Sequence, residues 1–198
     1  MRKLFFAVMV IGMMIAAGQM RAAEAGAKAS LGQVAPAISL KDLEGKDVSL
    51  SDYSGKTVVL EWVNPECPFV VRHYKAETMT KLADKYKDQD VVWLLIASGE
   101  TAGKAEVLKG FAKNQKLSHP ILLDPTRKVA QEYSAKTTPH MYVIAKDGKL
   151  VYMGGIDDDS AGSKGDKAVN HVDKALGEVV AGQTVSQAET KPYGCSIK

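Results

Sequence analysis

The sequence predicts one α/β domain built on a mixed β-sheet with helices on both faces, and three observations lead to this fold class. Two continuous apolar runs, residues 57–63 and 91–97, are typical of strands buried on both faces of a parallel sheet. A stretch with the apolar spacing of a helix separates the two runs, so together they form a βαβ unit. Later, Lys146-Asp147-Gly148-Lys149 has the Asp-Gly chemistry of a hairpin turn, which adds antiparallel strands to the sheet.

The elements before residue 90 follow from turn signals and spacing. Two short strands, residues 37–40 and 47–50, flank the turn residues Glu44-Gly45-Lys46 and form an N-terminal β-hairpin. One helix is expected from Pro68 to about Lys87. Its packing face consists of positions that recur every three or four residues, namely Val71, Tyr74, Thr78, Leu82 and Tyr86.

The second half of the chain continues the alternation of strands and helices. Helices are expected at residues 105–114, 127–133 and 168–180, and strands at residues 120–123, 141–145 and 149–153. Residues 157–165 are polar and contain glycine, so we expect a loop there in which Asp157, Asp158 and Asp159 are solvated.

The first 25 residues have the pattern of a secretory signal peptide. Arg2 and Lys3 precede an apolar run at residues 4–17, and Ala23-Glu24-Ala25 supplies small residues for cleavage. A membrane span needs roughly 20 apolar residues, so this run is short for one. We therefore expect a protein exported to the periplasm or secreted, with an uncleaved N-terminal anchor as the alternative.

After removal of residues 1–25, the chain divides into a flexible leader (26–33), one domain (34–182) and a tail (183–198) that carries Cys195. The formal net charge falls from +3 to +1, because Arg2, Lys3, Arg21 and Glu24 are lost. A charge so close to zero argues against a nucleic-acid partner. About 173 residues remain, enough for one domain with its own core.

The chain has only two cysteines, Cys67 and Cys195. In an oxidising compartment they either pair as a structural bridge or at least one performs redox chemistry. Cys67 directly precedes Pro68, a residue suited to the first position of a helix, so Cys67 lies at a helix N-terminus. The helix dipole and free N–H groups there favour a thiolate, the form that attacks disulfides and peroxides. The alternative is an inert cysteine packed in the core.

Three features in order resemble the thioredoxin superfamily, specifically the redoxins grouped with alkyl hydroperoxide reductase and thiol-specific antioxidant proteins (AhpC/TSA). They are a strand, turn and helix around Cys67-Pro68, the segment Thr137-Thr138-Pro139-His140 before a strand, and the hairpin at Lys146 to Lys149. The resemblance covers residues 34–182 and implies a thioredoxin-like fold. It implies a cis peptide bond before Pro139 and substrate binding by Thr138, Pro139 and Pro68. A proline that merely begins an edge strand is the alternative.

Two departures from this family pattern concern the chemistry. The second cysteine of the dithiol motif is replaced by Val70, so Cys67 cannot close a disulfide within its own turn. The positions where peroxiredoxins carry Pro and Thr or Ser hold Leu60 and Asn64. The arginine that many peroxiredoxins carry shortly before the strand at Met141 is also missing. The pattern therefore indicates a redoxin with a single cysteine at its thioredoxin-like site and argues against efficient peroxide reduction.

Glu61 is a carboxylate inside an otherwise apolar strand, six residues before Cys67. Thioredoxins resemble this arrangement in carrying a buried acid at that offset. Burial would raise the pKa of Glu61 and suit it to shuttle the thiol proton. An exposed glutamate at a sheet edge, without a role, is the alternative.

We therefore expect an extracytoplasmic thiol-disulfide oxidoreductase or thiol-dependent antioxidant redoxin that needs no cofactor. Cys67 is the nucleophile, and Cys195 is its resolving partner in the same chain or a second one. The 13 residues from Gly182 to Cys195 span about 20 Å as a coil, comparable with the domain's radius of gyration of about 16 Å. The partner is a thiol or disulfide protein or an external thiol reductant, and the oligomeric state stays open.

The alternative function is a redoxin-fold binding protein without turnover, which either holds a client or carries copper. A copper site would require Cys67, Cys195 and His140 to converge. The expectation is that the chain holds no metal, because the usual close cysteine pair is absent.

Overall fold

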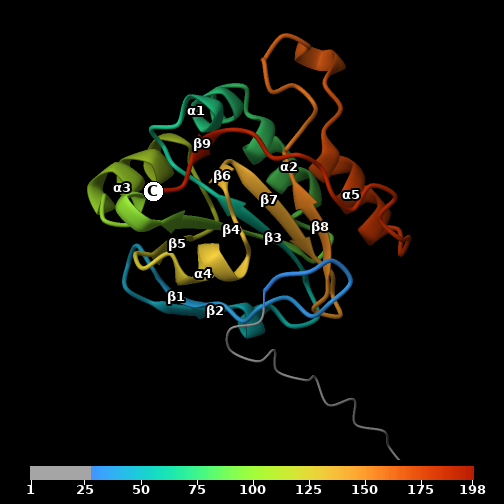
Figure 1. The fold of residues 1–198 in the computed structure, drawn as a ribbon, viewed down its shortest axis with the longest axis horizontal. Coiled ribbons are helices and arrows are strands. Elements are labelled where there is room, and N and C mark those ends of the chain that lie inside the picture. The colour runs from blue at the N-terminus through green and yellow to red at the C-terminus, as the bar shows by residue number, and fades with distance from the viewer. Residues whose placement is uncertain (1–27) are drawn as a thin grey trace, which may run out of the picture.

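The structure, a computed structural model, describes residues 28–198 and contains a seven-stranded mixed sheet in the order β2-β1-β5-β4-β3-β7-β8 (Figure 1). Its strands are β1 (Ser39–Asp42), β2 (Asp47–Ser49), β3 (Thr57–Trp62), β4 (Val91–Ser98), β5 (Ile121–Asp124), β7 (His140–Ile144) and β8 (Leu150–Gly154). The central strands β3, β4 and β5 are parallel, and the remaining pairs are antiparallel. The predicted α/β fold with a mixed sheet is confirmed. The expected signal peptide, residues 1–25, lies outside the described residues.

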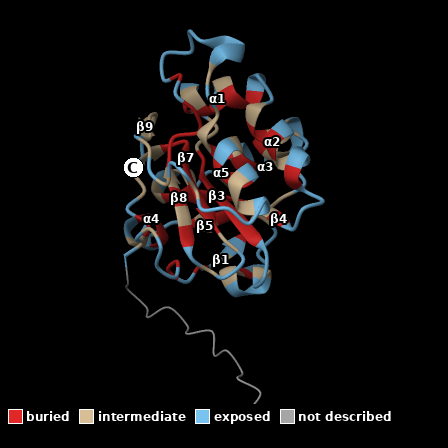
Figure 2. Ribbon diagram, turned by 90° about the vertical axis from the view of Figure 1, so that its right-hand side faces the viewer, coloured by how far each residue is buried: buried red, intermediate tan, exposed pale blue. Residues whose placement is uncertain are grey.

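Helices cover both faces of this sheet. They are α1 (Pro68–Lys75), α2 (Thr78–Tyr86), α3 (Ala105–Asn114), α4 (Lys128–Glu132) and α5 (His171–Val180), with short 3-10 helices at Leu50–Tyr53, Gly99–Thr101 and Gly165–Lys167. Side chains of β3 and of Val63, which follows it, alternate between two cores: Val59 and Val63 pack with α1, α2, α3 and α5, whereas Leu60 and Trp62 pack with α4. Figure 2 shows the buried strands in the middle of the molecule and helices whose outer sides are exposed.

The helix expected from Pro68 to Lys87 is two helices. Glu77 adopts a left-handed backbone conformation (φ 58°) between α1 and α2. The buried side chains of α2 are Met79, Leu82 and Tyr86, but Val71, predicted on the packing face, is 45% exposed. The prediction was wrong here because no Gly or Pro marks the break, and two short helices that follow one sheet preserve almost the same apolar spacing as one long helix.

Other boundaries shift by a few residues. The first strand begins at Ser39 instead of residue 37, and the last helix begins after Asn170, whose side-chain oxygen accepts a hydrogen bond from the backbone N–H of Asp173 at 2.8 Å. The segment expected as a flexible leader also contacts the domain: Ala29 and Gly32 donate backbone hydrogen bonds to Glu132 and Leu150, each at 2.8 Å. No helix among residues 28–198 is long and apolar enough to cross a membrane.

The tail after α5 returns across the molecule instead of leaving it, as the red segment in Figure 1 shows. It ends in β9 (Cys195–Ser196), which pairs antiparallel with β6 (Thr137–Thr138) in a separate two-stranded sheet. This pairing brings Cys195 next to Cys67 at the beginning of α1, and the C-terminal Lys198 accepts a backbone hydrogen bond from Glu100 at 3.1 Å.

Candidate active site

Cys67 lies where β3 gives way to α1. It is the N-cap residue of the helix, with an extended backbone (φ −77°, ψ 122°), and Pro68 takes the first helical position as predicted. The thiol of Cys67 donates a hydrogen bond to the backbone oxygen of Thr138 at 2.9 Å, and the residue is only 1% exposed. Cys67 is therefore both at a helix mouth and buried, a combination that the sequence treated as alternatives.

Thr138 and Pro139 form the opposite wall of this site. The peptide bond between them is cis, as the family resemblance implied, and both residues are buried. Pro68, in contrast, is exposed at the surface of the helix start. The structure thus brings together Cys67, Thr138 and Pro139 across a sequence separation of about 70 residues.

The second thiol is held beside the first. Cys195 is the register partner of Thr138 in the β6–β9 ladder, and Ile197 donates a further backbone hydrogen bond to Lys136 at 3.2 Å. Both cysteines are free thiols, Cys67 buried and Cys195 half-buried. The tail therefore places the only other cysteine of the chain next to the helix N-terminus that carries Cys67.

The two thiols differ in acidity. Burial by itself would raise the pKa of Cys67, but hydrogen bonds from the Cys195 thiol and the Val70 backbone stabilise the thiolate, and the pKa falls below its ordinary value. Burial, together with the interaction with Cys67, raises the pKa of Cys195 to about 11. Of the two thiols, Cys67 therefore loses its proton first as pH rises, while Cys195 remains a thiol.

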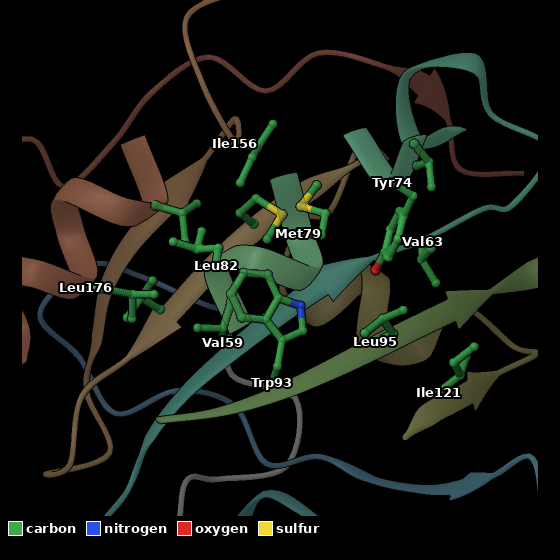
Figure 3. Close-up of a cluster of buried hydrophobic side chains, with 14 of the residues drawn as sticks. Val59, Val63, Tyr74, Met79, Leu82, Trp93, Leu95, Ile121, Ile156 and Leu176 are labelled. Atoms are coloured by element: carbon green, nitrogen blue, oxygen red, sulfur yellow. The ribbon is translucent and has the colours of Figure 1, made fainter. Parts of the chain in front are cut away.

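Glu61 lies inside the sheet and is completely buried, so the exposed edge position is wrong. Its Oε2 accepts hydrogen bonds from Trp93 Nε1 at 2.8 Å and from the hydroxyl of Tyr74, on α1, at 3.1 Å; Figure 3 shows these two side chains in the core. Burial raises the pKa of Glu61 to about 7, although both hydrogen bonds act to lower it. A carboxyl group with this pKa can exchange a proton at neutral pH.

The profile of the AhpC/TSA family matches residues 31–153, more than half of the chain. This chain belongs to the AhpC/TSA family. Curated relatives include a thiol-disulfide oxidoreductase ResA of Bacillus cereus, 33% identical over 63% of this chain and 69% of the relative. ResA of Geobacillus thermodenitrificans is 34% identical over 61% of this chain and 67% of the relative.

Solved structures extend the likeness beyond the region matched by the AhpC/TSA profile. A conserved protein from Geobacillus kaustophilus superimposes with a TM-score of 0.76 and 29% identity over 85% of this chain and 92% of its own. A protein from Sinorhizobium meliloti 1021 superimposes with a TM-score of 0.77 and 26% identity over 85% of this chain and 94% of its own. A putative thioredoxin from Neisseria meningitidis superimposes with a TM-score of 0.54 and 28% identity over 61% of this chain and 78% of its own. The thioredoxin-like fold of this AhpC/TSA member is thus confirmed.

The histidine considered as a copper ligand, His140, makes hydrogen-bonding contacts within the domain. His140 is buried, and its Nδ1 lies 3.2 Å from both the Tyr142 hydroxyl and the backbone nitrogen of Lys136. Burial lowers the pKa of His140 to about 4, so it stays neutral. Within residues 28–198, no group of three or more His, Cys, Asp or Glu side chains is placed to hold a metal ion.

The sequence missed the group that anchors the tail. Asp157 and Asp159, expected in a solvated loop, are buried. Asp157 accepts a hydrogen bond from the hydroxyl of Tyr193, two residues before Cys195, and the same hydroxyl lies 2.9 Å from Nε2 of His73 on α1. The one available signal was Tyr193, the single aromatic residue among residues 183–198.

Glu61→Gln is expected to stabilise the protein in a pH-dependent manner. As pH rises from 4.5 to 7, the carboxyl ionises in the unfolded chain before it does so in the folded protein, and the wild type loses stability. The variant should therefore match the wild type near pH 4 and exceed it by about 3 kcal/mol at pH 8. Urea unfolding at several pH values measures this difference. Glu66→Gln, which makes the same substitution at an exposed carboxyl next to Cys67, is the control.

Gly194→Ala is expected to release the end of the tail. Gly194 has φ 142°, and a Cβ atom there would lie 2.0 Å from the backbone oxygen of Thr138, so β9 could not keep its place against β6. Cys195 should then be alkylated at the rate of a cysteine in an unfolded peptide, while the thermal midpoint of the domain changes little. Gly182→Ala, also at a positive φ (70°) but with open space around the added Cβ, controls for backbone strain and should leave the protection of Cys195 intact.

Proposed function

We propose that this protein is an extracytoplasmic thiol-disulfide oxidoreductase in which Cys67 is the nucleophile and Cys195 of the same chain is the resolving thiol. The observation that carries the proposal is the β6–β9 pairing, which holds Cys195 opposite Thr138, whose carbonyl accepts the hydrogen bond from Cys67. The missing local partner at Val70 is replaced, in space, by a cysteine from the end of the chain.

In the reductive direction, the Cys67 thiolate attacks one sulfur of a substrate disulfide. A mixed disulfide forms, and the other substrate sulfur leaves as a thiolate that takes up a proton. Cys195 then loses its proton and attacks Cys67, which closes the Cys67–Cys195 bond and releases the second substrate thiol. The substrate gains two electrons and two protons, and the oxidised protein is returned to the dithiol by an external thiol reductant.

The acidities of the two thiols fit this order. The raised pKa of Cys195 results first from burial and then from its interaction with Cys67. Once Cys67 is tied up in a mixed disulfide, its negative charge is gone and that second cause disappears. Cys195 then deprotonates more readily at the stage where it must attack. Glu61, whose pKa is near neutrality, is the proposed acceptor for the proton of Cys67.

The comparisons support the reaction class, since the curated relatives are named thiol-disulfide oxidoreductases. Protein thiols or disulfides are therefore the proposed partners. Leu60 and Asn64, which depart from the peroxiredoxin pattern, favour disulfides over peroxides as the substrate class. The proposed export from the cytoplasm is supported by the signal-like pattern of residues 1–25.

Mass mapping of the oxidised protein tests the proposal. Treatment with one equivalent of a small disulfide should yield a peptide pair linked through Cys67 and Cys195 within one chain. In Cys195→Ser, the reaction should stop at a mixed disulfide on Cys67. If Cys195 of the wild type remains alkylatable after Cys67 has been consumed, it is not the resolving thiol.

A further inference from the structure

The docked tail brings Cys195 to the site and also covers the strand edge beside Cys67. The edge of β6, next to Cys67, is paired with the chain's own β9, and Cys67 is 1% exposed in this state. A reagent or protein disulfide from solution cannot reach a sulfur atom buried in this way. The first step of the reaction therefore requires the tail to move, whereas the resolving step requires the tail to be in place.

The tail is fastened by a cluster of polar side chains around Tyr193. Its hydroxyl contacts Asp157, Nε2 of His73 at 2.9 Å, and a terminal nitrogen of Arg72 at 3.4 Å. Asp157 and His73 are buried, and Arg72 also donates to the backbone oxygen of Asp159 at 2.7 Å. These contacts join the tail to α1, the helix whose N-cap is Cys67, and to the loop after β8.

The hydrogen-bonding capacity of the Tyr193 oxygen is completely used. A phenol has one proton to donate and two lone pairs to accept with. The proton goes to the carboxylate of Asp157, and the lone pairs accept from Arg72 and from His73 as its Nε2–H tautomer. The Tyr193 ring also packs edge-on against Phe69 at 5.8 Å and lies beneath the Arg72 guanidinium at 5.7 Å.

We propose that Tyr193 is a positioning residue that locks the tail, so that one contact both sets Cys195 against Cys67 and shuts Cys67 away from solution. Release of Tyr193 opens the site to a substrate disulfide, and its return delivers Cys195 for resolution. The delivery of Cys195 rests on the function proposed above, but the shielding of Cys67 does not depend on it.

The lock predicts two effects of opposite sign. Weakening the contacts of Tyr193 should make Cys67 more accessible from outside and should make the internal Cys67–Cys195 bond less favourable. A residue that merely supports the fold would alter stability without this opposed pair of changes. Loss of a hydrogen bond to a charged partner corresponds to roughly a 10- to 100-fold change in the equilibrium between docked and released tail.

Tyr193→Phe tests the proposal in two backgrounds. In Cys195→Ser, we expect the rate of Cys67 alkylation by iodoacetamide, measured on the high-pH plateau where the thiolate is fully formed, to rise at least about tenfold. With both cysteines present, the equilibrium constant for forming the Cys67–Cys195 bond against glutathione should fall by a similar factor. Asp157→Asn, which removes the charge that Tyr193 binds, should shift both measurements in the same directions.

Two control variants bear on the specificity of these changes. Tyr53→Phe removes a phenol hydroxyl that makes no hydrogen bond within residues 28–198, and Lys191→Ala changes an exposed residue in the same tail; neither should move either measurement. An unchanged alkylation rate in Tyr193→Phe would overturn the lock. If the wild type never forms the Cys67–Cys195 bond, the proposed resolving step fails, and the alkylation measurement still decides whether Tyr193 shields Cys67.

Discussion

Cys67→Ser is expected to abolish the reduction of small and protein disulfides, with a loss of about a thousandfold or more. A serine hydroxyl is not ionised at neutral pH, so the hydrogen bonds and helix N-terminus that stabilise the Cys67 thiolate have no anion to act on. The measurement is turnover with a coloured aromatic disulfide and excess dithiol reductant. Circular dichroism and the thermal midpoint should be close to those of the wild type, because the change of one buried atom leaves the packing of α1 in place.

Cys195→Ser separates nucleophile from resolving thiol. Without added reductant, this variant should release one equivalent of the coloured thiol at least as fast as the wild type and then stall as a mixed disulfide on Cys67. Full loss of the first release in Cys195→Ser, or turnover that survives Cys67→Ser, would reverse the assigned roles.

Oxidation is expected to stabilise the protein by about 4–5 kcal/mol, because a Cys67–Cys195 bond closes a loop of about 128 residues in the unfolded chain. Urea unfolding of the oxidised wild type, compared with its reduced form, measures this difference. The reduced Cys195→Ser variant is the matched control and should unfold close to the reduced wild type. Equal midpoints for oxidised and reduced wild type would mean that the bond does not form within one chain.

The reduction potential of that bond decides between catalysis and a permanent bridge. A catalytic bond should have a potential above about −300 mV, within reach of a thiol reductant. We expect the bond to become reducible when the tail is released, because a reductant can then reach its sulfur atoms. A potential below about −300 mV would instead identify a structural bridge and contradict the proposed turnover.

Local chemistry was enough to predict the framework of the site. The apolar run at residues 57–63 predicted β3 (Thr57–Trp62) because a strand buried on both faces must be apolar throughout. Cys67-Pro68 predicted a cysteine at a helix N-terminus. The N–H groups of the first helical turn have no partner within the helix, so proline, which lacks an N–H, loses no hydrogen bond there. Glu61, the one acid in this apolar run, was correctly predicted to be a buried carboxyl because the strand around it is buried on both faces.

Features that depend on contacts between distant segments were not available from such patterns. The break at Glu77 has no Gly or Pro to mark it, and Asp157, in the polar loop, is buried where it accepts a hydrogen bond from Tyr193 of the distant tail. A charged loop residue and a lone aromatic residue in a tail look solvated when each is considered in its own neighbourhood.

The sequence by itself determined that this protein has two cysteines, one at a helix mouth and one near the end of the chain, within a thioredoxin-like domain. It also showed that the tail is long enough to reach the site. The tertiary structure alone decided where the tail lies: antiparallel to β6, with Cys195 opposite Thr138 and Tyr193 held by Asp157, His73 and Arg72. The physical reason is that chain length sets only the distance a tail can cover. Its docked position depends on hydrogen-bonding groups that folding brings together from α1, β6 and the loop after β8.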